Sequence, residues 1–312
     1  MEEKERAFDL FSDTPTTVAV LGGSGFIGSH LVLNLLHMGY RLRLLVNRTN
    51  PDLVSPTGRI ETVRGSIENE PALKDCFAGC QVVYHLVGLI AETRTKTFQK
   101  TVVQGTERVV AAARATGVGK IIYLSALGAG PDQPSRYYRS KFAAERAVMA
   151  SGLDYTIFRP SIVFGPEDKF INMLAGMIRR SPVIPVIGDG RYRLQPVYVE
   201  ELCTVMARAA REPVTSGRTY EIGGPEPLTY LQILDIIKRV LNKKRMTVHV
   251  PVWMARMGAR VLELFLKPAP LTRDQIAMLA AGSTCDQTIA EREFDLRFLP
   301  LEQQLRKYMG TR

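Results

Sequence analysis

A glycine-rich turn near the start of the chain restricts the fold more than any other feature of the sequence. It lies in "VAVLGGSGFIGSHL" (residues 18–31), where glycines separate a short apolar run from apolar residues at helical spacing. In such a turn Gly22 permits a tight bend, Gly25 lets the backbone approach a pyrophosphate, and Gly28 lets a helix pack closely on a strand. The helix would also offer free N–H groups and a favourable dipole to phosphate. We therefore predict a dinucleotide site here rather than a turn without a ligand.

Alternating strand and helix signals continue to about residue 165. Short apolar runs predict strands at residues 16–23, 40–46, 60–65, 81–88, 120–128 and 154–165. Longer stretches with apolar residues at helical spacing predict helices, notably at residues 26–39, 105–117 and 140–152. Repeated strand–helix units give a parallel sheet with helices on both faces. The predicted fold class is α/β, a Rossmann-type doubly wound parallel sheet.

The pattern becomes less regular after Gly165. A strand is predicted at residues 219–224, then an amphipathic helix at residues 228–242 and a final helical region. We predict that residues 1–165 bind the nucleotide. Residues 166–312 would form a smaller, partly interleaved α+β region for a substrate or a partner.

Composition excludes several classes of protein. The formal net charge is +10, but the basic residues are spread along the chain and no nucleic-acid-binding motif occurs, so we expect no nucleic acid. The four cysteines and four histidines lie at no metal-ligand spacing, which predicts buried thiols, a reducing compartment and no metal site. The sequence has no signal-peptide pattern and no long apolar window. We expect a cytoplasmic protein that can lie at the inner face of a membrane, where its basic surface would suit anionic lipid.

The end of the second predicted strand bears on the choice of cofactor. A site that prefers NAD(H) usually has Asp or Glu there to hold the ribose hydroxyls. Here Asn47 occupies the position and Arg48 follows. A carboxylate would repel a 2′-phosphate, whereas Arg can bind it in a bidentate fashion. We therefore predict that NADP(H) is preferred, with NAD(H) as the alternative.

Three polar residues lie where a parallel sheet usually places its active site, beyond the carboxyl ends of the strands. Ser125 ends the fifth predicted strand, and Tyr137 and Lys141 are four residues apart on the next predicted helix. A nearby ammonium favours the phenolate of a tyrosine, whose ordinary pKa is ~10. We predict that Tyr137 is the acid–base group, that Lys141 lowers its pKa and holds the ribose, and that Ser125 holds a substrate oxygen. Tyr138, three residues before Lys141, is the competing tyrosine.

Together these motifs resemble the extended or atypical short-chain dehydrogenase/reductase superfamily. The likeness covers roughly residues 16–240, with the glycine turn, Ser125 and Tyr137-x-x-x-Lys141 in the right order. The segments "YHLVGLIAE", "LSALGA", "YYRSKFAAE" and "DYTIFRPSIVFGPEDKFIN" look like the branch that contains the NADPH-binding accessory subunit of mitochondrial complex I and its bacterial relatives. The resemblance implies a Rossmann-type fold.

The resemblance also implies which residues form the site. The catalytic residues would be Ser125, Tyr137 and Lys141. The cofactor would be bound by Gly22, Ser24, Gly25, Phe26, Ile27, Gly28, Asn47, Arg48, Ser66, Ile67, Leu86, Val87, Gly88, Tyr137, Lys141, Pro160, Ser161, Ile162 and Val163.

Three positions depart from the family pattern. Leu21 stands where many extended members have Thr, and Ser66 stands where many carry an Asp that holds adenine. Val102 stands where most members have an Asn that completes the proton relay. Because Ser125, Tyr137 and Lys141 are intact while this Asn is absent, two interpretations stay open. Either the site turns over, or it holds a cofactor without turnover.

Residues 250–268 predict an amphipathic helix. We expect it to be a lid or a core-packing helix; a partner-docking face and a helix lying in a membrane interface are the alternatives. Its apolar stripe consists of Trp253, Met257, Val261, Leu264 and Phe265.

Three functions fit these observations. The first is an NADP(H)-binding oxidoreductase acting on a carbonyl or quinone-like substrate. The second is a non-catalytic NADPH-binding accessory or assembly factor of a respiratory or quinone-related membrane complex, associated through its basic surface and the C-terminal helix. The third is a nucleotide-sugar epimerase or dehydratase, which ranks lower because the NAD-type acid and the Asn are absent. Fold alone does not choose among them.

Overall fold

A parallel β-sheet forms the centre of the molecule. The computed structural model describes residues 16–47, 58–266 and 269–310. Within these residues the main sheet has seven strands in the order β11-β6-β5-β4-β1-β2-β3, all paired in parallel. The strands are β1 (Thr17–Leu21), β2 (Arg41–Val46), β3 (Ile60–Arg64), β4 (Val82–His85), β5 (Lys120–Leu124), β6 (Asp154–Pro160) and β11 (Arg218–Ile222). This order, with its reversal at β1, confirms the predicted doubly wound fold class.

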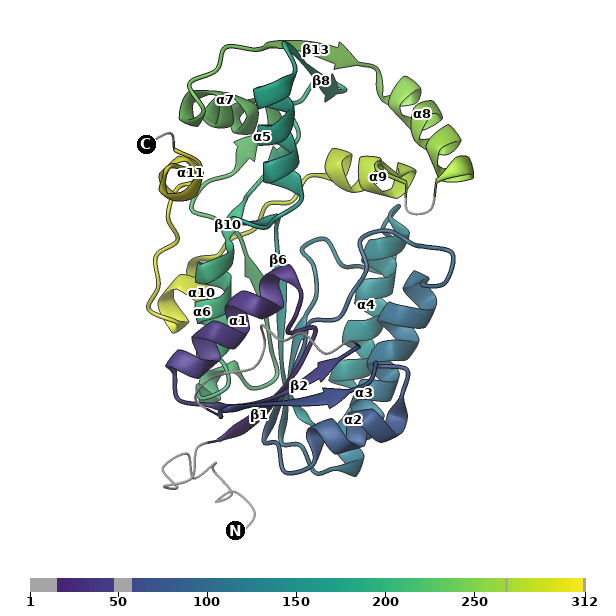
Figure 1. Cartoon of the computed structure of the whole chain (residues 1–312), viewed down its shortest axis with the longest axis vertical. Coiled ribbons are helices and arrows are strands. Elements are labelled where there is room, and N and C mark those ends of the chain that lie inside the picture. Colours follow the sequence, from purple (N-terminus) through teal and green to yellow (C-terminus); the bar gives the residue numbers. More distant parts are fainter. Residues whose placement is uncertain (1–15, 48–57, 267–268, 311–312) are drawn as a thin grey trace.

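Helices cover both faces of this sheet (Figure 1). One face packs against α1 (Phe26–His37), α6 (Val199–Arg208) and α10 (Thr288–Glu293). The other face packs against α2 (Glu70–Phe77), α3 (Gln104–Ala115) and α4 (Arg136–Met149). Since both faces are buried, the central strands are continuous apolar runs rather than alternating ones, which is why the sequence predicted them well.

A smaller region lies beyond the carboxyl edge of the sheet (Figure 1). It has its own core, formed by α5 (Phe170–Arg180), α7 (Tyr230–Val240) and α11 (Leu301–Met309) around β8 (Val183–Ile187). The remaining strands form short pairs: β7 (Val163–Phe164) with β10 (Val197–Tyr198), β9 (Arg193–Leu194) with β12 (Leu228–Thr229), and β8 with β13 (Met246–Val250). Because β11 and α6 come from beyond residue 165 yet join the main sheet and its helices, the two regions interleave as predicted.

Two further helices lead back towards the sheet. Helix α8 (Val252–Phe265) projects from the small region, and α9 (Arg273–Ala281) begins beside the start of α4 and runs away from it (Figure 1). Helix α9 begins with a capping box, in which the Thr272 hydroxyl accepts from the Gln275 N–H and the Gln275 side chain accepts from the Thr272 N–H. No helix of the described residues is long and apolar enough to span a bilayer.

Candidate functional site

The glycine turn has the geometry that a phosphate-binding turn requires. Gly22 has φ of +86°, and the Gly25 N–H donates to its carbonyl at 3.0 Å. A Cβ on Gly28 would lie 2.0 Å from the Gly22 oxygen, so only glycine lets α1 approach the turn this closely. Gly25 is the N-cap of α1, and no side chain of the described residues caps that end. The N–H groups at the start of α1 are therefore available to an anion.

Other predicted cofactor residues lie along the same edge of the sheet. The Leu86 N–H donates to the Leu21 carbonyl at 3.0 Å, and a Cβ on Gly22 would lie 3.3 Å from the Val87 nitrogen. Asn47 is exposed at the end of β2, whereas Arg48 lies outside the described residues. The chain after β4 thus runs directly beside the glycine turn along this edge.

The segment after β3 continues that edge. The Ser66 hydroxyl accepts from the Glu68 N–H at 3.2 Å, which forms a local turn. Ile67 is buried, and its Cδ1 lies 2.5 Å from where a Cβ on Gly105 would stand. Ile67 therefore packs α3 against the edge of the sheet.

Lys141 is buried beside the carboxyl end of β5. Its ammonium donates to the Leu124 carbonyl at 2.7 Å and to the Tyr123 hydroxyl at 3.4 Å, and it lies 4.9 Å from the centre of the Tyr123 ring. Burial lowers the pKa of Lys141 to about 8, and the Glu145 carboxylate opposes the shift. A Cβ on Gly88 would lie 3.2 Å from the Lys141 nitrogen, so the chain after β4 passes directly beside the ammonium.

Ser125 is the residue after Leu124, whose carbonyl binds the Lys141 ammonium. Its hydroxyl is buried, and among the residues that the structure describes it finds no hydrogen-bond partner. Such an unpaired buried hydroxyl costs free energy unless a ligand or water completes its bond. The position therefore suits a group that receives a hydrogen bond from Ser125.

Tyr137 lies in the first turn of α4, one turn before Lys141. Its ring is 5.9 Å from that of Phe98. Burial, with a smaller contribution from Tyr138, raises the pKa of Tyr137 above its ordinary value of 10.0, opposite to the shift that we expected from Lys141. At neutral pH the Tyr137 hydroxyl is therefore protonated, and it can donate a proton more readily than accept one.

A histidine that sequence reasoning missed stands at the end of β4. His85 is fully buried, and its Nε2 lies 3.0 Å from the Thr106 hydroxyl. Burial and the positive charge of Lys141 lower the pKa of His85 to about 3, so the ring is neutral. Its Nδ1 has no hydrogen-bond partner within the described chain. A polar residue ending a wholly apolar strand was the signal that could have revealed it.

The position of the missing Asn lies in an irregular turn. Residues Phe98–Val103 form a π-helix before α3, a distortion common at functional sites. Val102 is completely buried there, and its carbonyl accepts from the Thr106 hydroxyl at 2.6 Å. The Val102 side chain can supply no proton relay, which confines proton chemistry to the neighbouring polar groups.

Asp274 of α9 caps the helix that carries Tyr137 and Lys141. Its carboxylate accepts from the Ser135 hydroxyl at 2.8 Å, from the Arg136 N–H at 2.7 Å and from the Tyr137 N–H at 3.3 Å. A carboxylate at a helix N-terminus stabilises the helix, because its negative charge interacts favourably with the positive end of the helix dipole. The small region therefore helps to hold α4 in place.

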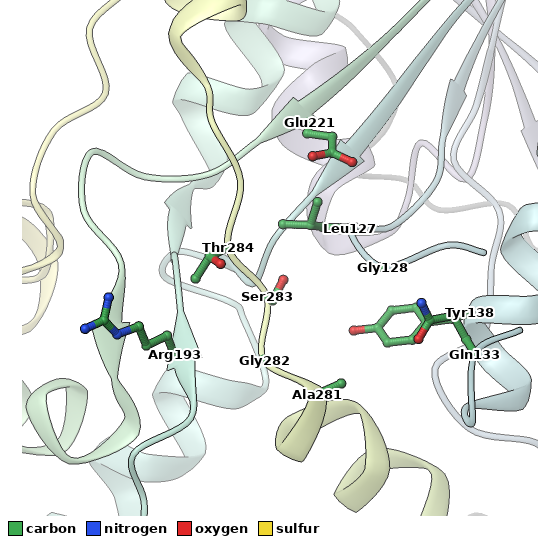
Figure 2. A pocket seen from close by; sticks show the side chains of 10 residues that line it. All are labelled: Leu127, Gly128, Gln133, Tyr138, Arg193, Glu221, Ala281, Gly282, Ser283 and Thr284. Carbon is green, nitrogen blue, oxygen red and sulfur yellow. The ribbon is translucent and has the colours of Figure 1, made fainter.

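A pocket of about 370 Å³ lies between the sheet and the small region. Figure 2 shows Tyr138 on one side, Arg193 on the other and the chain after α9 between them. Tyr138 packs on Gly128, where a Cβ would lie 3.1 Å from the ring, and burial raises the pKa of Tyr138 to about 12. The pocket is lined by Leu127, Gly128, Gln133, Tyr138, Arg193, Glu221, Ala281, Gly282, Ser283 and Thr284.

The chain after α9 crosses the segment that follows β6. The Ser161 hydroxyl donates to the Ser283 carbonyl at 2.9 Å. The Gln195 side chain accepts from the Cys285 N–H at 2.9 Å and donates to the Gln287 side chain at 2.7 Å. Pro160 accepts from the Leu127 N–H at 2.9 Å, while Ile162 and Val163 are half-buried and continue the chain towards the small region. This crossing forms the wall of the pocket that faces the small region.

Comparison with protein families gives a match over most of the chain. The model described as "NAD dependent epimerase/dehydratase family" matches residues 18–223, which include every predicted site residue.

Three curated relatives cover most of the chain as well. The mitochondrial NADH dehydrogenase (ubiquinone) 1 alpha subcomplex subunit 9 of Arabidopsis thaliana is 30% identical over 82% of this chain and 66% of that protein. A ceramide reductase of Caulobacter vibrioides is 31% identical over 78% of this chain and 76% of that protein. A 4-hydroxy-2-methyl-3-oxo-4-farnesyl-3,4-dihydroquinoline-1-oxide ketoreductase of Stigmatella aurantiaca is 28% identical over 88% of this chain and 90% of that protein.

A solved structure supports the fold. The dTDP-glucose 4,6-dehydratase of Streptomyces venezuelae, solved with NAD bound, superposes with a TM-score of 0.74 at 22% identity, covering 94% of this chain and 95% of that chain. At this identity the likeness concerns the fold alone.

Proposed function

Because the chain belongs to the NAD dependent epimerase/dehydratase family, we propose that it is a reductase that uses NADP(H) to reduce a carbonyl or quinone-like substrate. One observation carries the proposal. The Ser125 hydroxyl is buried without a partner among the described residues, directly after the Leu124 carbonyl that binds the Lys141 ammonium. A buried donor beside a buried ammonium suits an oxygen that gains negative charge during reduction.

The glycine turn and Lys141 would hold the cofactor. The start of α1 would bind the pyrophosphate, and Lys141, beside Gly88, would hold the nicotinamide ribose. NADP(H) is favoured over NAD(H) because an exposed amide, Asn47, stands at the end of β2 where an acid would select NAD(H), and Arg48 follows it in the sequence. We keep residues 1–165 as the cofactor-binding part and residues 166–312 as the substrate or partner part.

The residues of this chain would position the substrate and supply the proton. The bound nicotinamide supplies the hydride, and the reduced cofactor becomes oxidised as the carbonyl becomes an alcohol. Ser125 would donate a hydrogen bond to the substrate oxygen. Tyr137, whose raised pKa keeps it protonated, would transfer its proton to that oxygen. Lys141, with a pKa of about 8, is charged in most molecules at neutral pH and would bind the nicotinamide ribose.

The substrate would be lipophilic. The names of the three relatives refer to ceramide, to a farnesylated quinoline oxide and to ubiquinone, each of which carries a long apolar chain. The pocket lies beyond β5. Leu127, Gly128 and Ala281 are the apolar part of its lining, whereas Gln133, Arg193, Glu221, Ser283 and Thr284 are polar, so it is the relatives rather than the pocket that indicate a lipophilic substrate. A chain of this kind could extend from Ser125 towards the small region.

The second candidate is a protein that binds NADPH without turnover in a respiratory or quinone-related membrane complex. It is favoured by Val102, which is buried where the family relay has Asn, and by the relative named as a subunit of NADH dehydrogenase. A nucleotide-sugar epimerase or dehydratase ranks below both. The family name includes these enzymes, but the acid typical of NAD sites and the relay Asn are replaced here by Asn47 and Val102, and the solved dehydratase is 22% identical.

Two tyrosine variants separate these candidates. The wild-type protein would be mixed with NADPH and with aldehyde, ketone and quinone acceptors that carry apolar chains, and absorbance at the nicotinamide band would be followed. We expect Tyr137→Phe to lower the rate by roughly 10²- to 10⁴-fold. Tyr138→Phe removes the hydroxyl of the competing tyrosine but keeps the ring that lines the pocket, and it should retain most of the rate. Equal rates in wild type and Tyr137→Phe would overturn the assignment of Tyr137.

Binding measurements complete the test. The dissociation constant for NADPH should be lower than that for NADH, and it should change little in both tyrosine variants. Tight NADPH binding with no oxidation by any acceptor, together with co-purification of a membrane complex, would favour the second candidate.

A further inference from the structure

Helix α8 exposes an apolar face. The structure describes all fourteen residues of this helix, and Ala259 alone among them is buried. Leu264, Phe265 and Trp253 have exposed fractions of 75%, 73% and 62%. At 100° per residue the exposed apolar side chains fall within an arc of ~120°. They are Trp253, Met254, Met257, Val261, Leu264 and Phe265.

The opposite side of α8 makes the contacts within the molecule. Glu263 accepts from the Arg273 backbone N–H at 2.7 Å and from its guanidinium at 2.8 Å, which ties α8 to the start of α9. Figure 1 shows α8 extending away from the rest of the small region. The core-packing role expected from the sequence is therefore wrong for the apolar stripe.

The strand that precedes α8 also exposes apolar side chains. Met246 and Val248 of β13 are 72% and 48% exposed, and Val183 of the paired strand β8 is also exposed. Figure 1 shows β13 and α8 following one another along the same end of the molecule. We call Met246, Val248 and the six exposed apolar residues of α8 the α8–β13 face.

The segment that carries this face is basic. Residues 243–266 contain five Lys or Arg and one Asp or Glu. The one acid, Glu263, pairs with Arg273. Lys243, Lys244, Arg256 and Arg260 are all exposed, and within the described chain none of the four pairs with a carboxylate.

We propose that the α8–β13 face docks on the surface of a bilayer that contains anionic lipid, with α8 lying in the plane of the interface. Fourteen residues are too few to span the hydrocarbon core, for which about 20 are needed. An amphipathic helix with a Trp on its apolar side and Arg at the border is suited to the boundary between head groups and acyl chains. A second copy of the chain would instead bring these like charges together at a shared interface.

Docking would place the pocket near lipid. Helix α8 leads into α9, whose Asp274 caps α4 and whose last residue, Ala281, lines the pocket. If the proposed function also holds, a lipophilic substrate could enter directly from the bilayer. The docking itself does not depend on that function, because it can be measured without cofactor or substrate.

The chain provides its own reporter for this docking. Trp253 is the single tryptophan, and it lies in the face. The full-length protein would be titrated with vesicles of phosphatidylcholine alone and of phosphatidylcholine mixed with phosphatidylglycerol. With the anionic vesicles we expect a blue shift of Trp253 emission, quenching by brominated acyl chains and a loss of binding as salt is raised. No shift and no quenching with anionic vesicles would overturn the proposal. A blue shift that grows with protein concentration in the absence of lipid would overturn it too, in favour of a second copy.

Two variants and a control test the face by vesicle flotation. Met257→Glu with Leu264→Glu should weaken partitioning by at least roughly tenfold, because two apolar contacts are lost. Arg256→Gln with Arg260→Gln should weaken binding to anionic vesicles by roughly thirtyfold, at ~1 kcal/mol for each Arg. Ile289→Glu alters an exposed apolar residue on α10, away from the face, and should float like wild type. Equal flotation of all variants would contradict the proposed face.

Discussion

Gly28 offers a sharp test of the nucleotide turn, because the structure leaves no room for a side chain there. A Cβ at this position would lie 2.0 Å from the Gly22 oxygen, 2.8 Å from the Gly22 carbon and 2.8 Å from the Gly23 Cα. All three atoms are backbone, so no side chain can rotate away. In Gly28→Ala the turn and α1 would have to separate by about 1 Å, since Cβ contacts under 3.0 Å essentially never occur.

The magnitude follows from two opposing effects. Overpacking of this kind costs about 1–3 kcal/mol, and the upper end applies here because backbone must move. The better helix propensity of Ala offsets about 1 kcal/mol. We therefore expect Gly28→Ala to lower the free energy of unfolding by about 2 kcal/mol. The displaced N–H groups at the start of α1 should also weaken NADPH binding by roughly 10- to 100-fold, the worth of one charge-assisted hydrogen bond.

Gly176→Ala is the matched control. Gly176 also lies within a helix, α5, but a Cβ there would meet nothing within 4 Å. This variant should raise the free energy of unfolding by about 0.5–1 kcal/mol and leave NADPH binding unchanged. Urea unfolding followed by circular dichroism and a fluorescence titration with NADPH measure both quantities. If Gly28→Ala were as stable as Gly176→Ala and bound NADPH equally well, the assigned role of the turn would be refuted.

Three further variants test the surroundings of the candidate site. Asp274→Ala removes the carboxylate that accepts three hydrogen bonds at the start of α4. It should lower the free energy of unfolding, measured in urea, by about 1–3 kcal/mol. No loss of stability would mean that α9 does not hold α4. Burial depresses the folded-state pKa of His85 to about 3, so between pH 6.5 and 3 the unfolded chain binds a proton that the folded protein does not, and the free energy of unfolding should fall as pH drops through this range. His85→Gln should flatten this part of the plot of unfolding free energy against pH. An unchanged plot would contradict a neutral, buried His85. Burial depresses the folded-state pKa of Lys141 to about 8, so between pH 8 and 10.5 the unfolded chain keeps a proton that the folded protein has lost. The free energy of unfolding of wild type should therefore rise relative to that of Lys141→Met as pH increases from about 8 to 10.5. A constant difference between the two proteins would contradict the buried ammonium.

Local sequence patterns predicted the sheet and the glycine turn well. The strands of the nucleotide-binding half are buried on both faces, so each appeared as an apolar run that ends at a turn. The repeated strand–helix units then predicted that these strands pair in parallel, with helices on both faces of the sheet. Ser125, Tyr137 and Lys141 could be placed because the ends of strands and the starts of helices carry local signals.

The contacts between the two regions were not predictable in this way. Asp274 lies far along the chain from Ser135, and the capping bond between them depends on the path of α9 in space. The crossing of residues 281–287 over Ser161 likewise depends on contacts between residues far apart in the sequence, such as those of Ser161 with Ser283 and of Gln195 with Cys285 and Gln287. The spacing of apolar residues in residues 250–268 predicted a helix, but it did not show whether the apolar side of that helix faces the protein or solvent.

Transfer of deuterium from NADPH tests the central claim most directly. The protein would be mixed with NADPH labelled at the reactive carbon of the nicotinamide and with a ketone or quinone acceptor that carries an apolar chain, and the product would be analysed by mass spectrometry. The account predicts one deuterium in the reduced product with wild type and at least roughly 10²-fold slower transfer with Tyr137→Phe. Bound NADPH that transfers no deuterium to any acceptor, or equal transfer by wild type and Tyr137→Phe, would contradict it.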